Sequence, residues 1–173
     1  MKAKIFRESF KGKSIGRTMM NLHLSGFTLD GDILDLGGGL SPSYMRFIKM
    51  GACIVHTVDL NPPDGGIKAD LEDKLPLPSG FCNSVLCMNL LEHIYNHKEL
   101  VSEAHRLLKP GGLMLCCTPF MVHYHPNPHD YYRYTKDALY KMFTDVGFNV
   151  EEIRYIGLGP CSLLSENMWP FVP

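Results

Sequence analysis

The stretch ILDLGGG, residues 33–39, joins a short apolar run to three consecutive glycines. An apolar run of this length that stops at a turn signal is typical of a buried β-strand. Glycines at its end let the backbone turn sharply and approach a ligand closely, because no Cβ atom intervenes. Ser41 and Pro42 then form a predicted helix start, so we expect a helix over residues 42–50.

Outward from this stretch, strand-like and helix-like segments alternate along the chain. Residues 53–58, CIVHTV, predict a second strand that stops at Asp59 and completes a βαβ unit. Lys-Pro-Gly-Gly at residues 109–112 predicts a break after a helix. Further strands are expected over residues 67–69, 83–88, 113–118 and 148–156, and further helices over 98–108 and 136–146. The pattern predicts an α/β fold, a Rossmann-like, doubly wound and mostly parallel sheet flanked by helices.

Polar residues follow the predicted strands where such sheets bind ligands, at their carboxyl ends. Asp59 lies about 20 residues after Gly39, the separation at which an acid accepts hydrogen bonds from ribose hydroxyls. Asp70 follows the next short apolar run and is placed to meet an adenine amino group. We therefore expect a nucleoside-type ligand, although a glycine turn alone also occurs without one.

The glycine turn also bears on which nucleoside binds. A dinucleotide fingerprint needs a third glycine where Pro42 stands, which disfavours a nicotinamide-dependent oxidoreductase. Asp35 would place a negative charge near a pyrophosphate, whereas it would attract a ligand that carries an amino group and a sulfonium. The charge pattern therefore favours S-adenosylmethionine as cofactor.

Five ordered motifs carry a resemblance to a known family: ILDLGGG, VDLNP at residues 58–62, KADLED at 68–73, LCMNLLEHI at 86–94 and LLKPGGLMLCCTPF at 107–120. This series resembles the class I S-adenosylmethionine-dependent methyltransferases, close to their type 11 branch. The resemblance implies that Asp35 with Gly37, Gly38 and Gly39 contacts the methionine portion, and that Asp59 beside Leu60 contacts the ribose. It also implies that Asp70 with Leu71 contacts the adenine, and that Asn89 with Leu90 forms the floor near the sulfonium. Asn83 departs from the acid usual in this family. The final antiparallel strand of the family has no counterpart in residues 157–173, which suggests a truncated chain or a tail that covers a neighbour's sheet edge.

Residues 123–135, HYHPNPHDYYRYT, are dense in histidine and tyrosine, and we call them the His/Tyr segment. One interpretation is a substrate lid in which His125, His129 and Asp130 are the catalytic candidates. A second is a surface corner in which Asp130 pairs with Arg133, and a third is a metal site of His125, His129 and Asp130. We expect no metal. The pattern H-x-x-P-x-D-Y-x-R-Y-T resembles one found in methyltransferases of cell-surface sugar biosynthesis.

Composition narrows the function classes. The 173 residues are 45% apolar with a net charge of −1, which predicts one globular domain over residues 1–173 and no nucleic-acid partner. Residues 1–30 read as a basic helical segment and residues 157–173 as an irregular apolar tail. No apolar stretch reaches the roughly 20 residues of a membrane span, and we expect a cytoplasmic protein with six free thiols.

These observations together predict an enzyme, a methyltransferase acting on a small molecule such as a sugar or a surface-polysaccharide precursor. The alternative is a module of the same fold that binds S-adenosylmethionine or a nucleoside without turnover. A homodimer through the C-terminal tail or a sheet edge is a further expectation.

Overall fold

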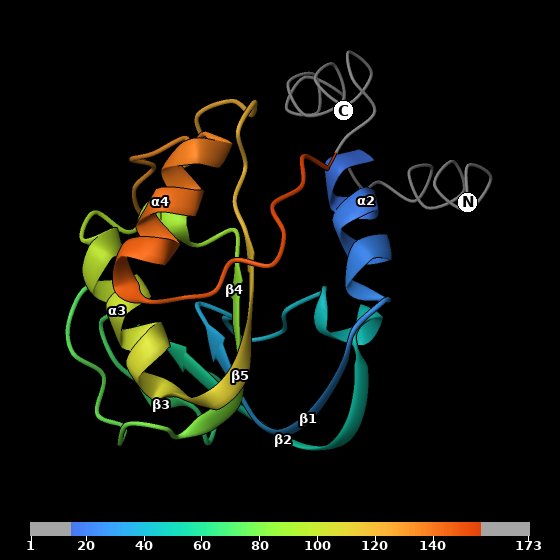
Figure 1. The fold of residues 1–173 in the computed structure, drawn as a ribbon, viewed down its shortest axis with the longest axis vertical. Helices are drawn as coiled ribbons and strands as arrows, with labels where there is room; N and C mark the ends of the chain where they lie inside the picture. Colours follow the sequence, from blue (N-terminus) through green and yellow to red (C-terminus); the bar gives the residue numbers. More distant parts are fainter. Residues whose placement is uncertain (1–14, 157–173) are drawn as a thin grey trace.

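The computed structural model describes residues 15–156, which form a five-stranded parallel sheet with helices on both faces (Figure 1). The strand order is β3-β2-β1-β4-β5. In chain order the elements are α2 Ile15–Leu24, β1 Thr28–Leu36, η1 Met45–Phe47, β2 Lys49–Asp59, β3 Ile67–Lys68, β4 Cys82–Met88, η2 Leu91–His93, α3 His97–Leu107, β5 Leu108–Cys117 and α4 Lys136–Val146. The predicted Rossmann-like, parallel sheet is confirmed.

Two apolar cores lie on opposite faces of the sheet. Figure 1 shows α3 and α4 side by side on one face and α2 on the other. Alternate residues of β1 separate these cores, because successive side chains of a strand point to opposite faces. Leu34 and Leu36 pack toward the side that includes Leu100 and Leu107 of α3, whereas Ile33 packs with Met20 of α2. All six are at most 4% exposed, so the sheet is covered from both sides around β1.

The predicted helix over residues 42–50 is wrong. The chain there forms only the short 3-10 helix η1, held by i to i+3 bonds such as Phe47 N–H to Tyr44 O at 2.9 Å. β2 already begins at Lys49, whose N–H donates to Phe27 O at 3.1 Å. Because the residues from Lys49 onward pair with the long strand β1, they cannot also form a full turn of α-helix. The βαβ unit lacks its α-helix.

The predicted strand over residues 148–156 is also wrong, since these residues form neither helix nor strand. Phe148, the first apolar residue of this pattern, packs against helices instead. The Phe148 ring lies 5.5 Å from that of Phe143 in α4 and 4.9 Å from that of His105 in α3. β5 consequently forms one edge of the described sheet. The predicted break at residues 109–112 falls inside β5, where the pairing with β4 is irregular.

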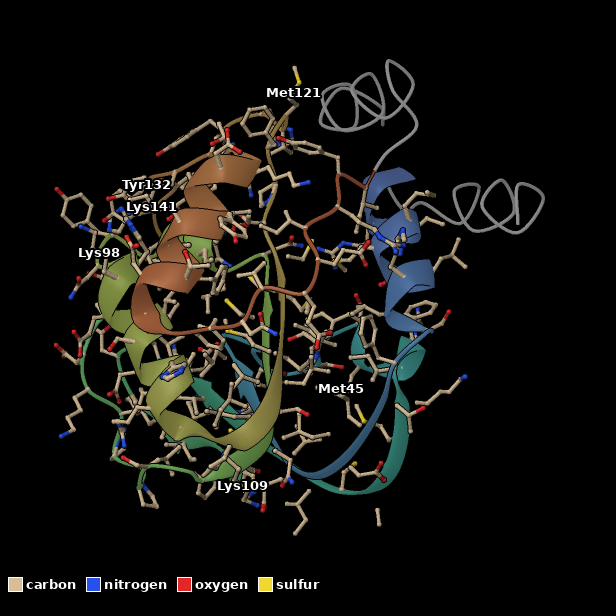
Figure 2. The ribbon with its side chains drawn as sticks, in the orientation of Figure 1. Met45, Lys98, Lys109, Met121, Tyr132 and Lys141 are labelled. Atoms are coloured by element: carbon tan, nitrogen blue, oxygen red, sulfur yellow. The ribbon has the colours of Figure 1, made fainter. Side chains whose placement is uncertain are left out.

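Because all the strands are parallel, their carboxyl ends lie at one edge of the sheet. The opposite end is closed by polar contacts around Asn83. Its Oδ1 accepts from Lys109 Nζ at 2.9 Å and from the Asp32 N–H at 3.0 Å. In Figure 2, Lys109 lies at one end of the molecule, and Met121 and Tyr132 at the other. The amide at position 83 thus serves to join three strands, far from the ligand-binding edge.

Some expectations fall on residues outside those described. They are the basic segment before residue 15, the apolar tail at 157–173 and the dimer formed through that tail. Between residues 15 and 156, no helix has both the length and the apolar character needed to cross a membrane.

Candidate functional site

The three glycines after β1 form a tight turn against the end of β2. Gly37 and Gly39 both have positive φ, 67° and 60°, in the left-handed region that favours glycine. The Gly37 N–H donates to Val58 O at 2.9 Å, and the Gly39 N–H donates to Asp59 Oδ2 at 3.2 Å. The sequence-predicted pair of glycine turn and ribose acid is therefore brought together.

Asp35 lies beneath this turn and is fully buried. Its Oδ1 accepts from the Tyr44 hydroxyl at 2.5 Å, but Oδ2 has no hydrogen-bond partner among residues 15–156. A Cβ atom on Gly38 would overlap Oδ2, so the glycine is what leaves room for this buried oxygen. Burial raises the pKa of Asp35 to about 7, and the charge of Asp59 acts in the same direction. An uncompensated buried carboxylate oxygen fits a ligand ammonium group.

Asp59 and Asp70 end neighbouring strands. Asp59 Oδ1 accepts from the Asn61 N–H at 2.9 Å, which orders the turn after β2. Asp59 pairs with Lys68 in β3, and Asp70 follows two residues later with an exposed side chain. Leu60 is 47% exposed beside Asp59, whereas Leu71 is buried in the core. Both Asp59 oxygens and Asp70 Oδ1 accept backbone N–H groups, so the two carboxylates are held in place at the same edge.

Asn89 and Leu90 close the other side of the glycine turn, after β4. Asn89 has a positive φ of 52°, and its N–H donates to Cys117 O at 2.7 Å. Leu90 is buried, and its Cδ1 would lie 2.6 Å from a Cβ atom on Gly37. Only glycine at position 37 lets the two loops meet this closely. The predicted floor residues are therefore adjacent to the predicted methionine-binding turn.

The His/Tyr segment is anchored on η2. The N–H groups of Tyr131 and Tyr132 donate to Glu92 O at 2.7 and 3.2 Å, and the Tyr134 hydroxyl donates to Leu91 O at 3.1 Å. These bonds bring the segment from after β5 back to the end of β4. The location agrees with a role over the ligand-binding edge.

Within the segment, Asp130 and Arg133 form a two-pronged ion pair. Arg133 donates to Asp130 Oδ1 at 2.5 Å and to Oδ2 at 2.7 Å, and the His125 N–H donates to Oδ2 at 2.9 Å. Arg133 and these hydrogen bonds hold the pKa of Asp130 far below its ordinary value. His129 is exposed, with its ring 5.3 Å from that of Tyr131. His129 thus lies at the surface, whereas His125 lies beside the ion pair of Asp130 and Arg133.

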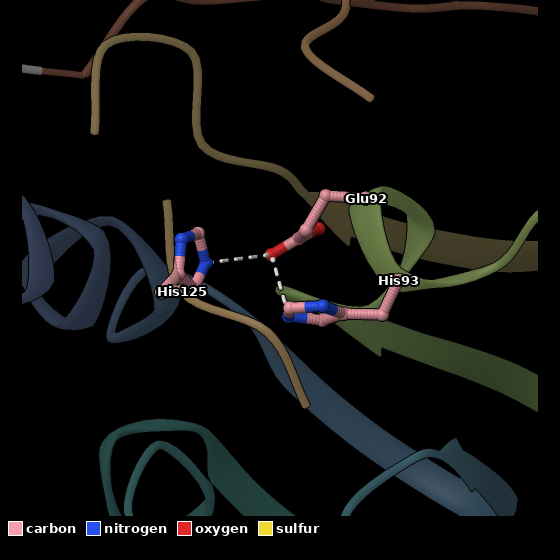
Figure 3. Close-up of side chains that lie close together, drawn as sticks. All are labelled: Glu92, His93 and His125. Carbon is pink, nitrogen blue, oxygen red and sulfur yellow. Dashed lines mark ion pairs between the residues drawn. The ribbon is translucent and has the colours of Figure 1, made fainter. Parts of the chain in front are cut away.

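His125 faces a buried acid, Glu92, together with His93 (Figure 3). The distance from Glu92 Oε1 is 3.6 Å to His93 Nε2 and 3.9 Å to His125 Nε2. The Glu92 side chain is 0% exposed, and burial raises its pKa to about 7. Thr118 at the end of β5 donates to its other oxygen at 3.3 Å. Residues from the ends of β4 and β5 and from the His/Tyr segment therefore meet at one point.

Comparisons with known proteins agree with this geometry. The family model of a methyltransferase domain, type 11, matches residues 34–116. A probable S-adenosylmethionine-dependent methyltransferase of Mycolicibacterium smegmatis is 31% identical over 85 residues, which are 46% of this chain and 33% of that protein. Residues 34–116 belong to a class I, type 11-like methyltransferase domain. The chain thus matches about a third of the length of this curated relative.

Solved structures support the fold of the methyltransferase domain. The candidate methyltransferase in complex with the Haloferax volcanii Trm112 activator superposes with a TM-score of 0.63 at 19% identity, over 84% of this chain and 73% of that chain. Phosphoethanolamine N-methyltransferase 2 of Haemonchus contortus, in complex with phosphomonomethylethanolamine and S-adenosylhomocysteine, superposes at 0.57 with 18% identity, over 75% of this chain and 36% of that chain. The predicted type 11 methyltransferase family is confirmed for residues 34–116, and S-adenosylmethionine is the cofactor named for the curated relative.

Tyr44, Glu92 and His93 of the candidate site are missing from the residues that the sequence predicted. Tyr44 lies in the region expected to be helical, where nothing indicated a contact with Asp35. Glu92 did carry a signal, because it is an acid between Leu91 and Ile94 in an otherwise apolar run. A buried acid in such a run needs a partner or a function.

Proposed function

We propose that this chain transfers a methyl group from S-adenosylmethionine to a small-molecule acceptor that binds beside His125. The observation that carries the proposal is the unpartnered, fully buried oxygen of Asp35 beneath the glycine turn. A buried carboxylate is costly to leave uncompensated, and the ammonium of the methionine portion supplies the missing charge.

The cofactor-binding roles follow the loops at the edge of the sheet. Asp35 and Gly37, Gly38 and Gly39 would hold the methionine portion, and Asp59 beside Leu60 the ribose. Asp70 with Leu71 would meet the adenine, and Asn89 with Leu90 would form the floor near the sulfonium. The order of these residues along one edge supports this assignment, because the glycine turn contacts both Asp59 and Leu90.

The chemical task of the protein residues is alignment. When bound, S-adenosylmethionine supplies a methyl group on an already activated leaving group. The protein must hold the acceptor about 3 to 3.5 Å from that methyl and exclude water. We assign His125 to the acceptor side of the site, because its ring lies beside the buried Glu92. Asp130 would act by positioning His125 through its backbone, and His129 would contribute from the exposed rim.

For the acceptor we propose a hydroxyl-bearing small molecule such as a sugar precursor. The exposed tyrosines around the His/Tyr segment support it, because a phenol ring offers an apolar face and a polar edge. Tyr95 and Tyr131 are 64% and 42% exposed, and their ring centroids lie 5.2 Å apart. The resemblance of the segment to methyltransferases of cell-surface sugar biosynthesis points to the same class.

Two measurements test the proposal. Titration calorimetry should detect S-adenosylmethionine binding and no tight binding of NAD, and the opposite result would refute the cofactor assignment. Incubation with a panel of nucleotide sugars should form S-adenosylhomocysteine only when the acceptor is present. Cofactor binding without product from any acceptor would favour the non-catalytic binding module. With an acceptor in hand, His125→Ala should lower turnover at unchanged cofactor affinity, and a wild-type rate would remove His125 from catalysis.

A further inference from the structure

The cluster of Glu92, His93 and His125 has a geometry that methyl transfer alone does not require. The Nε2 atoms and a Glu92 oxygen all lie within 4.8 Å of one another. The separations from Glu92 Oε1 are 3.6 and 3.9 Å. Ligand atoms bonded to tetrahedral zinc at about 2.0 to 2.1 Å are spaced by about 3.3 Å. Small side-chain movements would therefore bring all three atoms onto one ion.

The two histidines have the tautomer that metal binding needs. His93 Nδ1 lies 2.5 Å from His129 O, and His125 Nδ1 lies 2.9 Å from His123 O. A carbonyl oxygen only accepts, so the nearest contact of each Nδ1 favours a hydrogen there; the Arg133 guanidinium lies farther from His125 Nδ1, at 3.4 Å. In this tautomer each Nε2 is an acceptor, 3.6 or 3.9 Å from Glu92 Oε1. Histidines bound to metals are held in this way, with the second nitrogen donating to a carbonyl or carboxylate.

Glu92 supplies the independent sign that a ligand belongs here. Its side chain is 0% exposed, and Oε1 has no hydrogen-bond partner within the described part of the chain. Two ring nitrogens, which are acceptors in this tautomer, lie 3.6 and 3.9 Å from Oε1. Three acceptors facing one another without a hydrogen between them repel, unless a cation or added protons lie at their centre.

We propose that Glu92, His93 and His125 bind one divalent transition-metal ion of the zinc class. Two imidazoles and one carboxylate are a donor set that zinc uses in sites with an open fourth position. This departs from the expectation of no metal, and from the set of His125, His129 and Asp130, because the His129 ring lies at the exposed rim and Asp130 pairs with Arg133.

Glu92 follows Asn89 by three residues, so the cluster lies at the same edge of the sheet as the predicted cofactor-binding loops. An acceptor hydroxyl or a water molecule bound to the metal would have a lower pKa than in solution. This consequence rests on the proposed function, whereas the metal site itself does not.

The test uses the full-length, tag-free chain after removal of metals with a chelator. Zinc affinity is measured by competition with a chromophoric chelator, and Co²⁺ is added as a spectroscopic probe of tetrahedral nitrogen and oxygen ligands. We expect one Zn²⁺ per chain and visible Co²⁺ absorption. Glu92→Gln and His125→Ala should each weaken Zn²⁺ binding at least tenfold. His129→Ala, from the same segment, should bind Zn²⁺ as the wild type does.

Several outcomes would overturn the metal site. One is the absence of stoichiometric zinc binding by the wild-type chain. Another is equal affinity in Glu92→Gln, which retains all six cysteines and would reveal binding by thiols instead. Equal losses in the His129→Ala variant would also refute the assignment. Circular dichroism of each variant checks its folding. S-adenosylmethionine binding is measured on the same metal-free samples, so a failure of the proposed function is seen separately from a failure of the metal site.

Discussion

Replacing Asp35 by Asn should stabilise the ligand-free protein at alkaline pH while it impairs cofactor binding. The carboxyl is fully buried, and burial raises its pKa to about 7 from an ordinary 3.8. Between these two values the folded state holds a proton that the unfolded state has lost. Stability therefore falls as the pH rises from about 4 to about 7, and the penalty stays in full above that range.

The size of the effect follows from the same shift. Each pKa unit corresponds to about 1.4 kcal/mol, so the full penalty is about 4 kcal/mol, of which about 2.5 kcal/mol develops between pH 5 and pH 8. An amide cannot ionise and keeps an oxygen to accept from Tyr44. The difference in unfolding free energy between Asp35→Asn and the wild type should therefore grow in favour of the variant by about 2.5 kcal/mol over this range. The contribution of Glu92, also raised to about 7, cancels in this difference.

The assay is urea denaturation of both proteins at pH 5 and pH 8, with equal m-values as the check on two-state behaviour. Titration calorimetry with S-adenosylmethionine measures the effect of the substitution on cofactor affinity. Wild-type affinity should rise about tenfold between pH 6 and pH 8 as Asp35 loses its proton, and the variant should bind more weakly with little pH dependence. A stability difference that is constant with pH, or variant affinity equal to that of the wild type, would refute the role of Asp35.

Three further variants probe the same edge of the sheet. Asp59→Ala should weaken S-adenosylmethionine binding at least tenfold, or about 1.4 kcal/mol by calorimetry, because charge-assisted bonds to the ribose are lost; unchanged affinity would exclude the ribose role. Gly38→Ala should abolish cofactor binding, since its Cβ would displace the Asp35 carboxylate. Its control, Gly80→Ala, has open space for the Cβ but a positive φ of 65°, so it should lose some stability and still bind the cofactor normally. Arg133→Gln should lower the unfolding free energy by about 1 to 3 kcal/mol, because Asp130 loses its charged partner; a denaturation midpoint equal to that of the wild type would show that the pair is dispensable.

The sequence alone determined the fold class and the order of the ligand-binding loops. The strand over residues 53–58 and the helix over 136–146 are local patterns of hydrophobic period and turn residues, and they depend little on distant contacts. Gly37, Gly39 and Asp59 could be selected for the same reason, since parallel strands place their carboxyl ends at one edge.

Only the tertiary structure decided the features that depend on contacts between distant segments. The helix expected over residues 42–50 was lost because β1 extends far enough to pair with Lys49. In the segment 148–156, expected to be a strand, Phe148 instead packs on α3 and α4. The folding of the chain likewise buries Glu92 and brings it next to His125, 33 residues away in the sequence (125 − 92). The local sequence determines which backbone conformation each segment prefers. The burial of side chains and the contacts between charged groups depend on how separate loops pack together, so they arise only in the folded protein.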